Sequence, residues 1–298
     1  MADTPTDRPK SGQKTALVTG AGVGGIGGSL ATKLHEAGYF VICAVRRRVT
    51  AEPLVRPGII IVEMDVASTE SVEKAAHLVS FITGGRLDVL VNNAGVAAHR
   101  PVLELDIDGM VTDMFNVNVL GVMRATKSLS NLLIEAKGCI VNIGSIAPIA
   151  PLVFSSAYNA TKAALHAYGD SLSMEMKPFG VSVVTIVTGG VKSNFVREDT
   201  PRLPTDSLFL PVEKFWQQRV VQSQDGAMNT DEYAARVVRM IVKNNKPLWF
   251  WAGNKAFVVR ILYYILPRWL RLNIMANRSG LNILKQAVQK QEADKKNV

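Results

Sequence analysis

The chain has 298 residues, of which 48% are hydrophobic and 20% charged, and its formal net charge is +9. This composition is typical of a globular protein with enough apolar residues for a sheet covered on both faces, and it excludes a disordered chain. The positive charge fits a membrane surface or an anionic substrate, whereas no recognition motif or long basic tract indicates nucleic acid.

Residues 1–13 form a polar tail without the apolar stretch of a secretory signal, so we expect the protein to face the cytosol. From residue 14 onward, apolar runs alternate with helical patterns. Strands are expected at Lys14–Val18, Tyr39–Val45, Ile59–Met64, Leu87–Val91, Cys139–Ile143, Val181–Val187 and Pro247–Ala252. Helices are expected at Ser29–Ala37, Ser68–Ile82, Asp113–Ala136, Ser156–Lys177 and Asp231–Lys243. This alternation predicts a doubly wound parallel sheet, an α/β fold in one domain over residues 14–253.

Residues 188–229 are rich in Pro, Ser, Asp and Gln and have little periodicity, so we interpret them as a lid over a substrate site. Residues 254–298 form an apolar, basic extension at the C-terminus. The two cysteines, Cys43 and Cys139, lie inside apolar runs and read as small buried hydrophobic residues. Neither a disulfide framework nor a metal site is predicted.

A glycine-rich turn, TGAGVGGIGGSLA at Thr19–Ala31, joins the first strand to the first helix. Glycines at such a turn let the backbone approach a pyrophosphate, and the helix N-terminus supplies free N–H groups. The turn therefore predicts a Rossmann-type dinucleotide site, although glycine clusters also serve plain tight turns.

The second strand ends in Arg46, Arg47 and Arg48, where a carboxylate would accept the 2′-hydroxyl of NAD. Arginine at this place suits a 2′-phosphate, which its planar fork binds with two hydrogen bonds. We expect NADPH/NADP+ as the cofactor, with Arg46 and Arg47 as its contacts; the alternative is a solvated basic turn.

Tyr158 and Lys162 are four residues apart in a helical pattern, so their side chains share one face. A nearby ammonium group is expected to lower the pKa of the phenol, so that Tyr158 acts as a general acid. Ser145 follows the fifth strand and can direct its hydroxyl at the substrate oxygen. Two histidines have weaker signals. His166 is interpreted as a packed side chain, and His99 as a loop residue near the cleft with substrate contact as the less favoured alternative.

Together these motifs resemble the short-chain dehydrogenase/reductase family, whose TGxxxGIG signature matches Gly20, Gly25, Ile26 and Gly27 with one extra residue. The resemblance continues in the same order through NNAG at Asn92–Gly95, NVNVLG, IGSIA, YNATK and TGGVKSN at Thr188–Asn194. It implies that Asn118, Ser145, Tyr158 and Lys162 form the catalytic group, with Asn118 holding a water. It also implies a homo-oligomer, and cofactor contacts from Asp65, Asn93, Ala94, Gly95, Tyr158, Lys162, Val191 and Ser193.

Longer stretches, Glu135–Ser145 and Ala157–Val183, resemble the membrane-associated 1-acyldihydroxyacetone-phosphate reductases. The resemblance implies reduction of a ketone on a lipophilic substrate, with acyl-dihydroxyacetone phosphate as the candidate. An alternative is a tailoring ketoreductase or dehydrogenase of polyketide or terpenoid biosynthesis, which uses the same residues. A catalytically silent NADPH-binding regulator is a third reading, and the intact Ser145, Tyr158 and Lys162 disfavour it.

The segment Lys255–Met275 carries an apolar run interrupted by Arg260, Pro267, Arg268 and Arg271. A spanning helix needs about twenty mainly apolar residues, so we expect this segment to lie on a membrane rather than cross it. The surface of the endoplasmic reticulum or of a lipid droplet is the expected location. The alternative is that this segment forms a lid over the cleft, and one segment can serve as both a membrane contact and a lid.

Overall fold

The computed structural model describes residues 7–193, 202–221 and 226–296. Four stretches lie outside the described residues: 1–6, 194–201, 222–225 and 297–298. Two of them, 194–201 and 222–225, belong to the expected lid, and the first of these includes Asn194.

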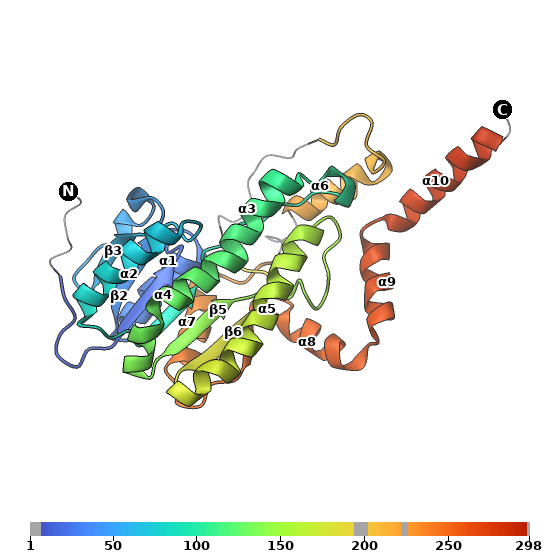
Figure 1. Ribbon diagram of the computed structural model, residues 1–298. Coiled ribbons are helices and arrows are strands. Elements are labelled where there is room, and N and C mark those ends of the chain that lie inside the picture. The colour runs from blue at the N-terminus through green and yellow to red at the C-terminus, as the bar shows by residue number, and fades with distance from the viewer. Residues whose placement is uncertain (1–6, 194–201, 222–225, 297–298) are drawn as a thin grey trace.

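One parallel sheet of seven strands forms the centre of the molecule, in the order β3-β2-β1-β4-β5-β6-β7 (Figure 1). The strands are β1 Thr15–Thr19, β2 Phe40–Val45, β3 Ile59–Glu63, β4 Val89–Asn92, β5 Cys139–Ile143, β6 Ser182–Thr188 and β7 Trp249–Ala252. Except in β7, where Trp249, Phe250 and Trp251 are partly exposed, the apolar side chains of the strands are buried on both faces, which explains why these strands read as continuous apolar runs. The strand order reverses between β1 and β4, and ligands of such sheets bind at the carboxyl ends on either side of that point. The expected doubly wound fold in one domain is confirmed.

Helices cover both faces of the sheet (Figure 1). α1, Ile26–Glu36, and α7, Thr230–Ile241, pack side by side in the core on one face. The other face is covered by α2, Thr69–Thr83, α4, Gly121–Ala136, and α5, Ser156–Met176. Both layers present apolar stripes to the strands, as expected of amphipathic helices on a buried sheet.

The expected helix Asp113–Ala136 is not one regular helix. A short α3, Thr112–Phe115, leads into a π-helical turn at Asn116–Leu120, and only then does α4 begin. A second π-helical turn, Ile107–Val111, precedes α3. Such turns occur often at functional sites, and the later one contains Asn118.

The expected lid also contains a regular element. α6, Glu213–Val221, follows a 3₁₀ turn within this region, and the sequence pattern predicted no helix there. The side chain of Trp216 on α6 is fully buried in a small cluster with Phe154, Leu203 and Val212.

Three further helices, α8 Ala256–Ile265, α9 Arg268–Arg278 and α10 Leu281–Lys296, extend away from the sheet at the C-terminus (Figure 1). Ala256 is the one buried residue that they contribute among their described positions. Leu281 and Leu284 at the start of α10 pack against the cluster around Trp216, so the extension touches the lid region. Within the described residues, no helix is both long enough and apolar enough to cross a membrane.

Candidate active site

The glycine-rich turn leads from β1 into α1. Gly25 is the N-cap residue of α1, and the first turn of this helix holds neither an acidic residue nor a side-chain cap. Its N–H groups can therefore face a pyrophosphate. A Cβ atom at Gly27 would lie 2.4 Å from both Asn93 Nδ2 and the carbonyl oxygen of Gly20, so no larger residue fits. Gly20 has a φ of +66°, which favours glycine, and Ile26 begins the helix. The turn thus fits a dinucleotide.

The extra residue relative to the family signature lies in the loop before Gly25. Gly24 has a φ of +76°, and the N–H of Val23 donates to the carbonyl oxygen of Thr50 at 2.9 Å. The longer loop therefore contacts the turn after β2 through this hydrogen bond, and Gly25 remains the residue before the first turn of α1.

Thr19 fixes the loop that follows β4 against the end of β1. Its Oγ1 accepts the backbone N–H groups of Asn93 and Ala94, each at 3.0 Å. In return, Asn93 Nδ2 donates to the carbonyl oxygens of Thr19 and Gly20 at 2.9 and 3.1 Å. Asn93 and Ala94 therefore lie beside the glycine-rich turn, and the cofactor contacts expected of Asn93, Ala94 and Gly95 stay predictions. The sequence carried no signal for the role of Thr19.

Asn118 connects this loop to α5. Its Nδ2 donates to the carbonyl oxygen of Val96 at 2.8 Å and to Thr161 Oγ1 at 3.1 Å, and its Oδ1 accepts the N–H of Val96 at 2.8 Å. The side chain is fully buried. The water that the resemblance assigns to Asn118 stays a prediction.

Arg46 and Arg47 follow β2 at the same edge of the sheet, and both are exposed. Arg48 lies 4.0 Å from Glu52, whereas no carboxylate among the described residues lies within 4.0 Å of Arg46 or Arg47. Both guanidinium groups are thus accessible to a phosphate. Asp65 follows β3, where its carboxylate accepts the N–H of Ala67 at 3.0 Å and orders the loop.

α5 and the end of β5 bring Tyr158, Lys162 and Ser145 together. Lys162 Nζ lies 5.9 Å from the centre of the Tyr158 ring and donates to the carbonyl oxygen of Ile143 at 2.9 Å. Ser145 Oγ accepts the N–H of Ala147 at 3.1 Å and is hydrogen-bonded to Tyr158. The predicted catalytic side chains therefore share one site.

The pKa values of this site follow from burial. Burial raises the pKa of Tyr158, and the hydrogen bond from Ser145 and the charge of Arg219 only partly offset it. Burial also lowers the pKa of Lys162 to about 8. The prediction that the ammonium of Lys162 gives Tyr158 a lowered pKa is therefore wrong, because desolvation of the phenolate outweighs the groups that stabilise it.

Two histidines support the site. His166 is buried, and its Nε2 accepts the backbone N–H of Ser145 at 3.2 Å, so this packed histidine holds the serine loop. His99 Nδ1 is hydrogen-bonded to Ser155 Oγ at 2.8 Å, and its ring lies 6.3 Å from the Tyr158 ring, edge to face. Burial lowers the pKa of both histidines to about 4, and both are therefore neutral at pH 7.

The end of β6 closes the opposite side of the site. The carbonyl oxygen of Thr188 accepts the N–H of Ile146, and Thr188 Oγ1 is hydrogen-bonded to Tyr233 Oη at 2.8 Å. Val191 is buried and forms a bridge with Met228, while Ser193 is partly buried. Both predicted contacts thus lie on the segment that follows β6.

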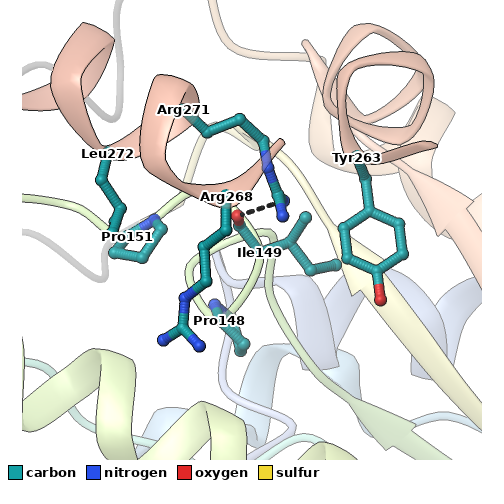
Figure 2. Close-up of a pocket in the computed structure, with 7 residues that line it drawn as sticks. All are labelled: Pro148, Ile149, Pro151, Tyr263, Arg268, Arg271 and Leu272. Atoms are coloured by element: carbon teal, nitrogen blue, oxygen red, sulfur yellow. Dashed lines mark hydrogen bonds between the residues drawn. The ribbon is translucent and has the colours of Figure 1, made fainter. Parts of the chain in front are cut away.

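A pocket of about 310 Å³ lies between the loop after Ser145 and the helices α8 and α9 (Figure 2). Arg271 Nη1 donates to the carbonyl oxygen of Ile149 at 3.0 Å, and its guanidinium lies 5.0 Å from the centre of the Tyr263 ring. The pocket is lined by Pro148, Ile149, Pro151, Tyr263, Arg268, Arg271 and Leu272. The C-terminal extension thus contacts the loop that carries Ser145.

Comparisons with known proteins agree with this geometry. A family model described as short chain dehydrogenase matches residues 14–203. A short-chain dehydrogenase, RED1, of Pyricularia oryzae is 39% identical over 281 residues, covering 90% of this chain and 98% of the relative. An NADPH-dependent 1-acyldihydroxyacetone phosphate reductase of Schizosaccharomyces pombe is 34% identical, covering 84% of this chain and 88% of the relative. The crystal structure of a short-chain dehydrogenase from Streptomyces avermitilis superposes with a TM-score of 0.73 at 27% identity, covering 94% of this chain and 99% of that one.

Proposed function

The chain belongs to the short-chain dehydrogenase family and is an NADPH-dependent oxidoreductase, and we propose that it reduces a ketone on a lipophilic substrate. The observation that carries this proposal is the cluster of Tyr158, Ser145 and Lys162 at the carboxyl ends of β4 and β5. Acyl-dihydroxyacetone phosphate is the leading candidate for the substrate.

In this mechanism Tyr158 donates its phenolic proton to the substrate oxygen, which gains negative charge during reduction. An ordinary phenol has a pKa near 10 and is protonated at pH 7, and burial raises the pKa of Tyr158 further, so the side chain holds the proton that it donates. Ser145 Oγ donates a hydrogen bond to the same oxygen, and Lys162 stabilises the phenolate left behind. When bound, NADPH supplies the hydride.

Arg46 and Arg47 hold the 2′-phosphate of the cofactor in this proposal. Both side chains are exposed and lie beside the glycine-rich turn at the carboxyl edge of the sheet. The double substitution Arg46→Ala/Arg47→Ala is expected to weaken NADPH binding at least about tenfold, or about 1.4 kcal/mol, and to leave NADH binding unchanged. Fluorescence titration of both cofactors measures this, and equal losses for the two would contradict the assignment.

The substrate class is supported by the Schizosaccharomyces pombe relative and by the apolar C-terminal helices beside the site. The test follows NADPH absorbance with purified protein and two sets of ketones, acyl-dihydroxyacetone phosphate and a panel of cyclic ketones. We expect kcat/KM for the acyl compound to exceed that of every cyclic ketone.

The second candidate is a tailoring ketoreductase of polyketide or terpenoid biosynthesis. The Pyricularia oryzae relative, a short-chain dehydrogenase whose name states no substrate, is compatible with it and is more similar over more of the chain than the Schizosaccharomyces pombe reductase. The same residues serve both reactions, so the ranking of substrates in that assay decides between them. A cyclic ketone ranked first would replace acyl-dihydroxyacetone phosphate as the candidate.

We also propose that the protein lies on a cytosol-facing surface of the endoplasmic reticulum or a lipid droplet. In support, α8 and α9 expose large apolar side chains, Phe257, Tyr264, Ile265 and Trp269 among them. Basic residues such as Arg260 and Arg268 lie on the same helices and can meet anionic lipid headgroups.

A further inference from the structure

Arg219 lies on α6, one helical turn beyond Trp216. Trp216 fixes the position of this helix, because its indole is fully buried and Nε1 donates to the carbonyl oxygen of His99 at 2.9 Å. The ring of His99 in turn lies 6.3 Å from that of Tyr158. The lid helix is thereby tied to the loop of His99 beside Tyr158, and the charge of Arg219 acts to lower the pKa of both Tyr158 and His99.

The charge of Arg219 has no counter-charge in the described part of the chain. No carboxylate oxygen there lies within 4.0 Å of its guanidinium, and its buried Nε has no hydrogen-bond acceptor. The neighbouring His99 is neutral, and Arg100 lies 5.4 Å from the centre of the Trp216 ring, which adds a second positive charge. Arg219 is partly buried, and a charge withdrawn from water without a partner is costly for a protein. A bound anion would supply the missing partner.

We propose that Arg219 is a specificity-determining residue that binds an oxyanion of the substrate, a phosphate ester or a carboxylate, close to the ketone. The guanidinium fork suits either group because both accept two parallel hydrogen bonds. This inference rests on the proposed function and deepens it, because Arg219 would make the enzyme prefer anionic ketones to neutral ones.

The pocket beside α9 contains two further arginines, Arg268 and Arg271 (Figure 2). Arg271 already donates to the carbonyl oxygen of Ile149, and its guanidinium lies over Tyr263. Arg268 is exposed to solvent. Of these three, Arg219 is the one whose charge acts on the pKa of Tyr158, so the structure favours it as the anion contact, and Arg268 offers a matched control.

The first test measures binding without turnover. Full-length protein saturated with NADP+, which occupies the cofactor phosphate sites, is titrated calorimetrically with octyl phosphate, octanoate and octanol. We expect Arg219→Met to lose at least about tenfold in affinity for the preferred anion, to leave octanol binding unchanged, and to bind NADP+ normally. Arg219→Lys keeps the charge and should retain part of the affinity. The phosphate and carboxylate arms show which oxyanion is preferred.

Two results would overturn the proposal. One is an equal loss for octanol and the anions in Arg219→Met, and the other is a loss of anion affinity in Arg268→Met with none in Arg219→Met. If Arg219→Met does not fold, Arg219→Gln is measured against the same outcomes.

The second test measures turnover of acyl-dihydroxyacetone phosphate and of the same ketone without its phosphate. We expect Arg219→Met to reduce the ratio of their kcat/KM values at least about tenfold. A change in both values with a constant ratio would mean that Arg219 acts only through Tyr158, which contradicts the proposal. If wild-type protein turns over neither ketone, the proposed substrate fails, and the binding result still decides the role of Arg219.

Discussion

Individual side chains in this site serve either proton transfer or the placement of another group. Tyr158 is the one placed to give a proton. His166 holds the backbone of Ser145, the N–H of Ala147 binds the Ser145 hydroxyl, and the carbonyl oxygen of Ile143 binds Lys162. These bonds explain how two buried polar residues keep defined positions next to Tyr158.

Removing the phenolic hydroxyl of Tyr158 tests its role directly. Tyr158→Phe should lower kcat at least about 100-fold, because the proton donor is lost while little packing volume changes. NADPH binding should stay nearly intact. Tyr168→Phe on the same helix is the control, since Tyr168 faces α4 and the core away from the site. Steady-state kinetics measure both variants, and a tenth or more of wild-type activity in Tyr158→Phe would exclude Tyr158 as the acid.

Lys162 is expected to cost stability in exchange for its chemistry. Its pKa falls from 10.5 to about 8, so the free energy of unfolding carries a penalty of up to about 3 kcal/mol below pH 8. Between pH 8 and 10.5 the unfolded chain binds more protons at this group, and the penalty disappears as pH rises. Lys162→Met should therefore be inactive yet more stable than wild type at pH 7, with the difference vanishing near pH 10.5.

Urea unfolding at both pH values measures the effect of Lys162→Met. The exposed Lys127 on α4 supplies the control, because Lys127→Met should show no such pH-dependent gain. A Lys162→Met protein less stable than wild type at pH 7 would show that the hydrogen bond to Ile143 outweighs desolvation.

At the scale of the elements, the strands of the sheet could be predicted from the sequence, whereas the π-helical turn and α6 beside the cleft could not. Cys139–Ile143 matches β5 residue for residue, because a strand buried on both faces is a continuous apolar run bounded by polar residues. The π-helical turn around Asn118 does not interrupt the apolar pattern of the sequence, so the sequence pattern could not distinguish it from a regular helix. α6 was missed because the short helix is held by the tertiary contacts of Trp216 rather than by an apolar stripe.

The membrane proposal belongs to α8 and α9. Phe257, Tyr264 and Trp269 are 68%, 72% and 64% exposed, so replacing all three by serine removes no core contact. In flotation with phosphatidylcholine vesicles containing phosphatidylserine, wild-type protein should float and the triple variant should lose at least about tenfold in binding.

The matched control for flotation replaces Phe81, Met174 and Phe179, which are exposed on α2, α5 and the turn after α5, by serine. This control should float like wild type. Equal flotation of both triple variants, or a wild-type protein that stays in the soluble fraction, would remove α8 and α9 as the contact surface. A cut after Asn254 is a poorer test, since it also removes the packing of Leu281 and Leu284 on the lid cluster.

At the scale of the whole molecule, two neutral histidines, the buried His166 and the partly buried His99, limit the stability of the fold in acid. The pKa of His99 and of His166 falls from 6.5 to about 4. Between pH 6.5 and 4 the unfolded chain binds up to two more protons at these groups than the folded one, so the free energy of unfolding decreases as pH falls. Each histidine contributes up to about 3 kcal/mol to this loss.

His166→Gln tests the contribution of one histidine, because glutamine keeps an acceptor for the N–H of Ser145 and does not titrate. The pH dependence of the unfolding free energy in this window should fall by about half. His77→Gln, at an exposed position of α2, should leave the slope unchanged. A wild-type slope in His166→Gln would contradict the buried neutral state.

The single α/β unit and the order of the site residues were predictable because the motifs follow the strands in chain order. The role of Arg219 could not be predicted, because only the folded chain brings its segment to the Tyr158 side of the cleft. The homo-oligomer implied by the resemblance stays a prediction.

Both cysteines of the chain are buried, Cys43 in β2 and Cys139 in β5, and burial raises the pKa of each thiol to about 12. At neutral pH almost no thiolate is present, so maleimide reagents should leave the native protein unmodified. A cysteine introduced by Tyr264→Cys would then be the single reactive thiol. A polarity-sensitive fluorophore attached there would report directly whether α8 enters the acyl-chain region of a vesicle, at what depth, and whether substrate binding draws it out.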